Sequence, residues 1–133
     1  MSVSVVLSGG ILTVLTTDKN SYAPGEPVRI TLSKQNISAQ PIVLSYPTAQ
    51  RYDFIINGFD NSFWQWSADK TFAAVAGQVN LGPGQGLSYT ETWEQKNNQG
   101  QPVSPGFYRI TGWNTFTGFT GYPVPSTFIF ISR

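Results

Sequence analysis

The sequence predicts an all-β protein, an antiparallel β-sandwich of about eight or nine strands that forms one domain over residues 1–133. Short segments alternate apolar and polar residues with a period of two, and turn-forming residues separate them every 8–12 residues or so, roughly the spacing of small β-sandwiches. No segment repeats its apolar residues at the helical spacing of about 3.6 over a longer window. Strands that follow one another without helices between them typically pack as two sheets face to face.

The strands can be placed in order along the chain. Residues 1–10 form either a short edge strand or a loose terminus that ends at Gly9 and Gly10. Pro24 and Gly25 set a tight corner after the next strand. Residues 70–79 are ambiguous between a helical turn and a short strand. The clear strands are expected within residues 11–17, 27–35, 42–46, 50–67 (a two-stranded hairpin), 87–94, 107–115 and 127–131.

The hairpin within residues 50–67 is the densest run of large side chains in the chain. Asn57 and Gly58 predict its turn, since both residues tolerate a positive φ. Trp64 and Trp66 lie on one face of its second strand. We interpret the two tryptophans as core residues, and the alternative is a stacking platform of the kind that carbohydrate-binding modules use.

The composition excludes several kinds of active site. The chain has no cysteine and no histidine, so it can form neither a Ser-His-Asp triad nor a thiolate or imidazole metal site. None of the seven carboxylates is spaced as a cation-binding loop would require. We therefore expect no enzymatic activity, no catalytic residues, no metal and no cofactor.

The charge pattern excludes other partners. Charged residues make up 11% of the chain, the net charge is +1, and the eight basic residues are scattered, so we expect no nucleic-acid binding. The N-terminal apolar run lacks a basic flank and is too short to span a membrane, so we expect no membrane partner. A cytoplasmic location is favoured, with export after removal of a signal as the alternative.

Four segments together resemble a known family. They are Y-A-P-G-E-P-V at residues 22–28, Q-R-Y-D-F at 50–54, F-W-Q-W-S at 63–67 and T-W-E-Q-K-N-N-Q-G-Q-P-V-S-P-G-F-Y at 92–108. The chain from about Leu12 to Ile131 is similar to the BsuPI-type domain, the intracellular proteinase inhibitor family of Bacillus and related bacteria. The residues that carry this structural signature are Arg51, Tyr52, Asp53, Phe54, Trp64, Trp66, Trp93 and Tyr108.

The resemblance implies an immunoglobulin-like sandwich that inhibits an intracellular serine proteinase of the subtilisin type through a surface loop. We expect such an inhibitor to be a monomer. The alternative hypothesis is an immunoglobulin-like adhesion or carbohydrate-binding module without inhibitory activity. A third hypothesis is a structural domain whose edge strands pair with other copies.

The aromatic loop at residues 113–125 is the main candidate for partner binding. Its rings and prolines give an extended segment with no obvious core face, and exposed aromatic residues on loops are common interface anchors. The candidate contact residues are Trp113, Phe116, Phe119, Tyr122, Pro123 and Val124. The alternative is that these rings fold back and cap the open end of the sandwich. Residues 69–86 are a second candidate, because their middle shows little strand or helix pattern.

Overall fold

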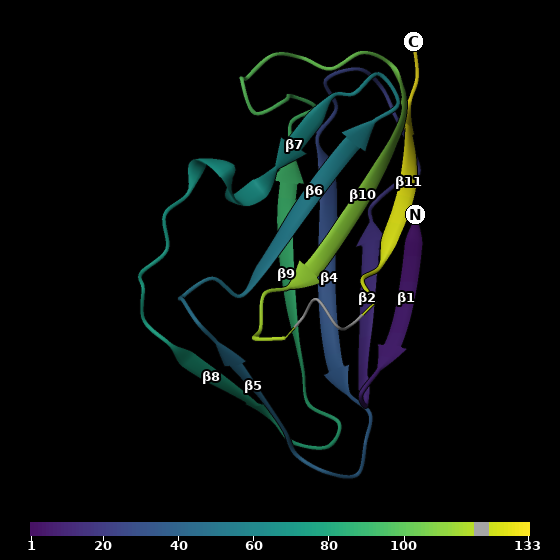
Figure 1. Ribbon diagram of the computed structural model, residues 1–133. Helices are drawn as coiled ribbons and strands as arrows, with labels where there is room; N and C mark the ends of the chain where they lie inside the picture. The colour runs from purple at the N-terminus through teal and green to yellow at the C-terminus, as the bar shows by residue number, and fades with distance from the viewer. Residues whose placement is uncertain (119–122) are drawn as a thin grey trace.

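Two sheets pack face to face in the computed structural model, which describes residues 1–118 and 123–133 (Figure 1). All neighbouring strands pair antiparallel except β11 and β3, which are parallel. The four-stranded sheet has the order β1 (Val3–Ser8), β2 (Ile11–Thr17), β4 (Val28–Asn36) and β9 (Gly86–Trp93). The five-stranded sheet has the order β3 (Ser21–Tyr22), β11 (Ser126–Ile131), β10 (Gly106–Asn114), β6 (Tyr52–Gly58) and β7 (Phe63–Gln65).

A small two-stranded sheet extends the molecule at one end of the sandwich (Figure 1). It pairs β5 (Ile42–Tyr46) with β8 (Gly77–Leu81), and a short 3₁₀ helix, η1 (Trp66–Asp69), follows β7. The all-β sandwich is confirmed, but the described residues form eleven strands instead of eight or nine. Residues 3–8 form an edge strand, while β3 and β8 are short strands that the alternation of the sequence does not reveal.

The main core lies between the two large sheets. Leu15, Ile30 and Leu32 from the four-stranded sheet meet Phe54 and Ile110 from the other, and all five side chains are fully buried. Within residues 27–35 and 50–56, the apolar residues that alternate along each strand therefore point into the core. A second, smaller cluster joins the β5–β8 sheet to the sandwich and consists of Ile11, Leu44, Tyr46 and Leu81.

Trp93 and Tyr108 close one end of the main core. Their rings lie 5.4 Å apart, and both residues are buried. The Tyr108 hydroxyl donates to the carbonyl of Ser104, four residues upstream, and the Trp93 indole donates to the carbonyl of Lys96 at 2.9 Å. A buried tyrosine that bonds back to the preceding loop is a feature of immunoglobulin-like sandwiches.

The predicted turn at Asn57 and Gly58 is wrong. Both residues belong to β6, and the turn follows at residues 59–62, where Asn61 has the positive φ of 67°. Gly58 has a packing role instead, because a Cβ there would lie 2.7 Å from the ring of Tyr108. The second strand of the hairpin is also short, so Trp66 begins η1 and does not extend the sheet.

Candidate functional site

Asp53 fixes the chain where β7 passes into η1. Its side chain is 3% exposed and accepts hydrogen bonds from the backbone N–H of Phe54 (2.9 Å) and of Ser67 (3.2 Å). The hydroxyl of Ser67 donates to its second oxygen at 2.6 Å, and the amide of Gln65 does so at 2.7 Å. Asp53 is therefore a hydrogen-bond anchor, since each of its oxygens accepts from two donors.

A column of aromatic rings stands beside this anchor. Trp66 stacks on Tyr52 at 4.6 Å between ring centroids, and Tyr52 stacks on Tyr89 at 4.3 Å. The Tyr52 hydroxyl donates to the carboxylate of Glu91 at 2.6 Å. Trp64 instead tilts against Trp93 at 6.4 Å. Both Trp64 and Trp66 are half-buried and pack against the main core, as their interpretation as core residues requires.

Arg51 lies at the entrance to the small sheet. Its guanidinium sits 4.5 Å above the ring of Tyr46 and donates to the carbonyl of Thr48 at 2.7 Å. Gly77, the first residue of β8, leaves room for it, because a Cβ on Gly77 would lie 2.6 Å from the guanidinium. The structure shows no ion pair between Arg51 and Asp53 within its described residues.

A buried lysine lies beneath Arg51. Lys34 is 1% exposed, and its ammonium donates to the Tyr46 hydroxyl at 2.6 Å and lies 5.2 Å from the rings of Tyr46 and Tyr89. Burial, with a smaller contribution from the charge of Arg51, lowers the pKa of Lys34 to about 8. The alternation that turns Leu32 inward also turns Lys34 inward, so the sequence did contain a signal for this residue.

Between η1 and β8 the chain leaves the body of the molecule. Residues 70–76 have the sequence K-T-F-A-A-V-A and form neither helix nor strand. Figure 1 shows them as an open curve on the outer side of the molecule, from the end of η1 to the start of β8; we call them the arch. Except for Phe72, which is half-buried, all of them are exposed, and the side chain of Val75 is 64% exposed. Residues 69–86, the second candidate segment, include this arch.

The aromatic loop at residues 113–125 is only partly described. Trp113 and Phe116 are half-buried, and Phe116 packs against the second cluster, as the alternative of rings folded onto the sandwich requires. Pro123 and Val124 are exposed, with Val124 at 41%. Phe119 and Tyr122 lie outside the described residues.

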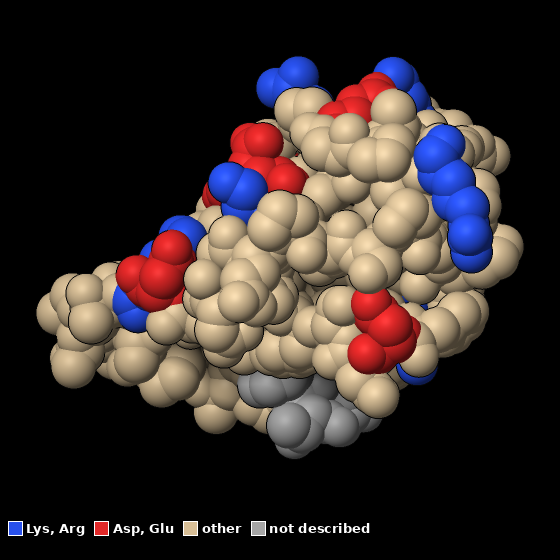
Figure 2. Space-filling model, turned by 90° about the horizontal axis from the view of Figure 1, so that it is seen from above, with Lys and Arg blue, Asp and Glu red and all other residues tan. Residues whose placement is uncertain are grey.

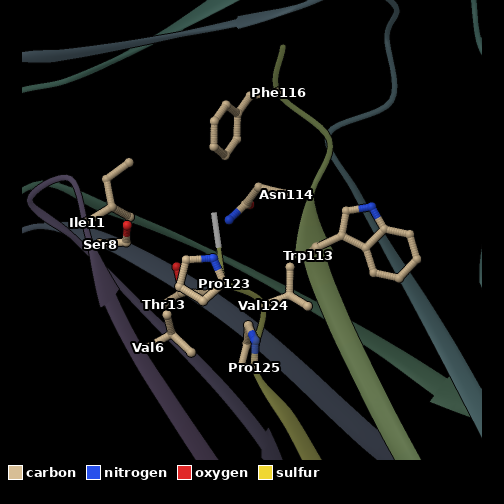
Figure 3. A pocket seen from close by; sticks show the side chains of 10 residues that line it. All are labelled: Val6, Ser8, Ile11, Thr13, Trp113, Asn114, Phe116, Pro123, Val124 and Pro125. Carbon is tan, nitrogen blue, oxygen red and sulfur yellow. The ribbon is translucent and has the colours of Figure 1, made fainter. Parts of the chain in front are cut away.

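A small cavity separates this loop from the β1–β2 hairpin (Figure 3). Its volume is about 30 Å³, which is room for one water molecule. Asn114 points into it between Phe116 and Pro123, and the Asn114 side-chain oxygen is buried without a hydrogen-bond partner among the described residues. This volume does not suffice for a cofactor or a substrate.

Charged groups are sparse on the surface. Figure 2 shows them in small separate groups of both signs, with wide uncharged areas between them. Within residues 1–118 and 123–133, no three metal-ligating side chains cluster, and no helix is long and apolar enough to cross a membrane. Most of this face is therefore uncharged.

Comparison with known proteins gives a family and a fold. Residues 15–118 match the BsuPI family, described as intracellular proteinase inhibitor. No curated protein matches the chain.

The solved structures similar to this chain are much longer proteins. One is an alkylpurine DNA glycosylase of Pseudomonas fluorescens, with 13% identity, a TM-score of 0.53, and coverage of 90% of this chain and 29% of that one. Another is a β-glucosidase of Erythrobacter marinus, with 13% identity, a TM-score of 0.50, and coverage of 89% and 15%. The chain thus spans less than a third of either protein, and these likenesses concern the fold alone.

Proposed function

This chain belongs to the BsuPI family of intracellular proteinase inhibitors, and we propose that it inhibits a serine proteinase of the subtilisin type inside the cell. It does so by placing a surface loop in the active-site cleft of the enzyme. The family is one of inhibitors, and the chain itself is not an enzyme. The observation that carries the proposal is the match over residues 15–118, which runs from within β2 to just beyond the end of β10.

The fold supports a blocking mechanism that needs no chemistry from the inhibitor. Two packed sheets form a rigid frame, and a loop held by such a frame loses little conformational entropy when it binds. A stable complex of this kind buries about 1,600 Å² in total. Both the loop at residues 113–125 and the arch connect elements of the frame, so either one can dock while the other stays outside the interface.

The neutral surface supports the same kind of partner. An apolar substrate cleft gains from contact with uncharged side chains, whereas burial of unpaired charges there is unfavourable. Pro123 and Val124 are exposed and uncharged, and so are the alanine residues of the arch. We propose that the inhibitor acts as a monomer and forms a complex with one enzyme molecule.

Titration of purified subtilisin-like proteinases with the protein tests the proposal. We expect activity on a peptide substrate to fall to zero as the inhibitor is added, with an end point at one inhibitor per enzyme. A serine proteinase that cleaves after lysine or arginine is the control and should stay active, because its primary pocket favours a cation. Full activity of several subtilisin-like enzymes at micromolar inhibitor would contradict the proposal.

A further inference from the structure

We propose that the arch, residues 70–76, is the segment that enters the substrate groove of the proteinase. There it lies as an extended strand in the place of a substrate. This inference rests on the proposed function and names its contact segment. Three properties of the arch lead to it: the free main chain, the uncharged side chains and the two fixed ends.

The main chain of the arch is available for hydrogen bonds. The carbonyl of Ala73 accepts from the backbone N–H of Ala49 at 2.9 Å, but no described residue bonds to the main chain of Ala74 or Val75. Proteins that capture an extended peptide do so by adding it as a strand, through main-chain hydrogen bonds. A proteinase groove that reads a substrate in this way can read Ala74 and Val75 as well.

The side chains of the arch suit a groove with apolar subsites. Beyond Lys70 the arch carries no charge, and Ala73, Ala74 and Ala76 are small enough to fit any subsite. Val75 is a large apolar side chain of the segment that is 64% exposed. Entry of these residues into the groove therefore has no cost for the desolvation of a charge.

The first end of the arch is fixed by the aromatic column. The ammonium of Lys70 lies 4.7 Å from the ring of Trp66 and donates to the Trp66 carbonyl at 3.1 Å. The ring of Phe72 lies 5.9 Å from Trp66 on the same stretch of chain. Trp66 in turn stacks on Tyr52, and Asp53 holds the backbone of Ser67.

The second end of the arch is fixed by Arg51 and the small sheet. Gly77 pairs with Tyr46 at the start of β8, and the guanidinium of Arg51 fills the space beside it. Arg51, Tyr52, Asp53 and Trp66, which carry the family resemblance, therefore all serve the ends of the arch. Because both ends are tied to the sandwich, a cut within the arch would release neither new terminus from the enzyme, which favours inhibition over turnover.

The test compares charge insertions in the two candidate segments. Val75→Asp should raise the inhibition constant by about 100-fold, because the carboxylate would enter an apolar groove. Val124→Asp tests the other candidate segment: it introduces the same charge at an exposed valine there (41%), and because the arch is the segment that docks, its inhibition constant should stay within about twofold of wild type. Both melting temperatures should remain those of wild type, and Ala74→Asp repeats the test should Val75→Asp unfold.

Three outcomes separate the inference from the function on which it rests. A wild-type protein that inhibits none of the proteinases contradicts the proposed function. The inference alone is overturned if the wild-type protein inhibits, Val75→Asp inhibits as strongly as wild type, and Val124→Asp inhibits weakly. Deuterium exchange gives an independent readout: the amides of residues 71–76 should become protected in the complex, and unchanged exchange there would also overturn the inference.

Discussion

The arch and the connection between β10 and β11 are both surface segments, but they relate to the body of the protein in opposite ways. In the connection, Thr115 and Thr117 donate backbone hydrogen bonds to Arg51 at 3.2 Å and to Ser45 at 2.7 Å, and the ring of Phe116 packs on the second cluster. In the arch, the main chain of Ala74 and Val75 forms no bond to any described residue. Residues 115–117 of the aromatic segment thus lie on the sandwich, whereas the arch stands away from it.

The difference has a simple physical origin. A phenylalanine ring gains about 2 kcal/mol or more when it is buried, whereas an alanine methyl gains little. A loop rich in rings therefore tends to fold onto the nearest apolar surface, and a loop of alanine and valine does not. Exposure of the main chain, combined with fixed ends, is thus a better indication of a docking segment than aromatic content.

Removal of the anchor at Asp53 should produce the largest loss of stability. It should also release the first end of the arch, which distinguishes the arch from the other segment. Asp53→Ala removes the acceptor of four buried or partly buried donors, among them the N–H of Ser67. We expect a loss of about 3 kcal/mol in the free energy of unfolding and a melting temperature about 10 °C lower. Calorimetry measures this. The melting temperature of Asp53→Asn, which keeps one acceptor oxygen, should lie between those of Asp53→Ala and wild type. Equal melting temperatures of all three proteins would contradict the anchor role.

Much of the frame could be predicted from the sequence because its physical signals are local. Alternation placed Ile30, Leu32, Phe54 and Ile56 correctly on the inner faces, since a strand turns every second residue to the same side. The strand β8 was ambiguous because its pairing with β5 depends on residues about 35 positions away, and no local pattern encodes such contacts.

The candidate site was less predictable, because it depends on the distances between segments. The sequence indicated that Tyr52 and Trp66 matter but gave no means of knowing that their rings stack. Gly77 lies in the segment that was ambiguous between a helical turn and a strand, whereas the folded chain shows that it leaves space for Arg51. The arch could be recognised only as a segment without pattern, since its fixed ends are a property of the folded chain.

Replacement of Trp66 sharpens the comparison by separating stability from inhibition. Trp66→Ala removes the stack on Tyr52 and the contact with Phe72, so we expect a loss of about 2 kcal/mol and a weaker inhibitor. Trp64→Ala is the matched control, because the ring of Trp64 packs on Trp93, whereas the described ring contact with the arch is made by Trp66. It should lower the melting temperature by a similar amount but leave the inhibition constant unchanged. Equal inhibition constants for the two variants would contradict a role of Trp66 in the arch.

Because Lys34 is buried near Arg51, at the second end of the arch, we expect the stability of the protein to depend on pH. The pKa of Lys34 is about 8 in the folded protein, below its ordinary value of 10.5, so the unfolded chain binds the proton more tightly. The buried charge of Lys34 therefore destabilises the folded state by its full amount below about pH 8. The free energy of unfolding should rise as the pH increases from about 8 to 10. The groups that face the ammonium are Arg51, Tyr46 and Tyr89, and burial raises the pKa of both tyrosines, so their ionisation acts only at higher pH.

Melting curves of wild type and Lys34→Met between about pH 7 and pH 10 measure this contribution. The melting temperature of the wild type should rise relative to that of the variant over this interval. Inhibition by Lys34→Met at neutral pH should be unchanged, because the described contacts of the Lys34 ammonium are with Tyr46 and Tyr89, outside the arch. Parallel curves for the two proteins would show that Lys34 does not titrate in this range.

The smallest expected effect concerns Gly77, where the arch enters β8. In Gly77→Ala the new methyl would clash with the guanidinium of Arg51, which would have to move. It can move, because it is the end of a flexible side chain. We expect the free energy of unfolding to fall by about 1 kcal/mol, roughly the effect of one displaced surface contact. The inhibition constant should rise severalfold. In an Arg51→Ala background the same substitution should have no further effect, since the two groups then no longer meet. Additive effects in this double-mutant cycle would mean that Gly77 is required for its backbone alone, and that Arg51 does not hold the end of the arch.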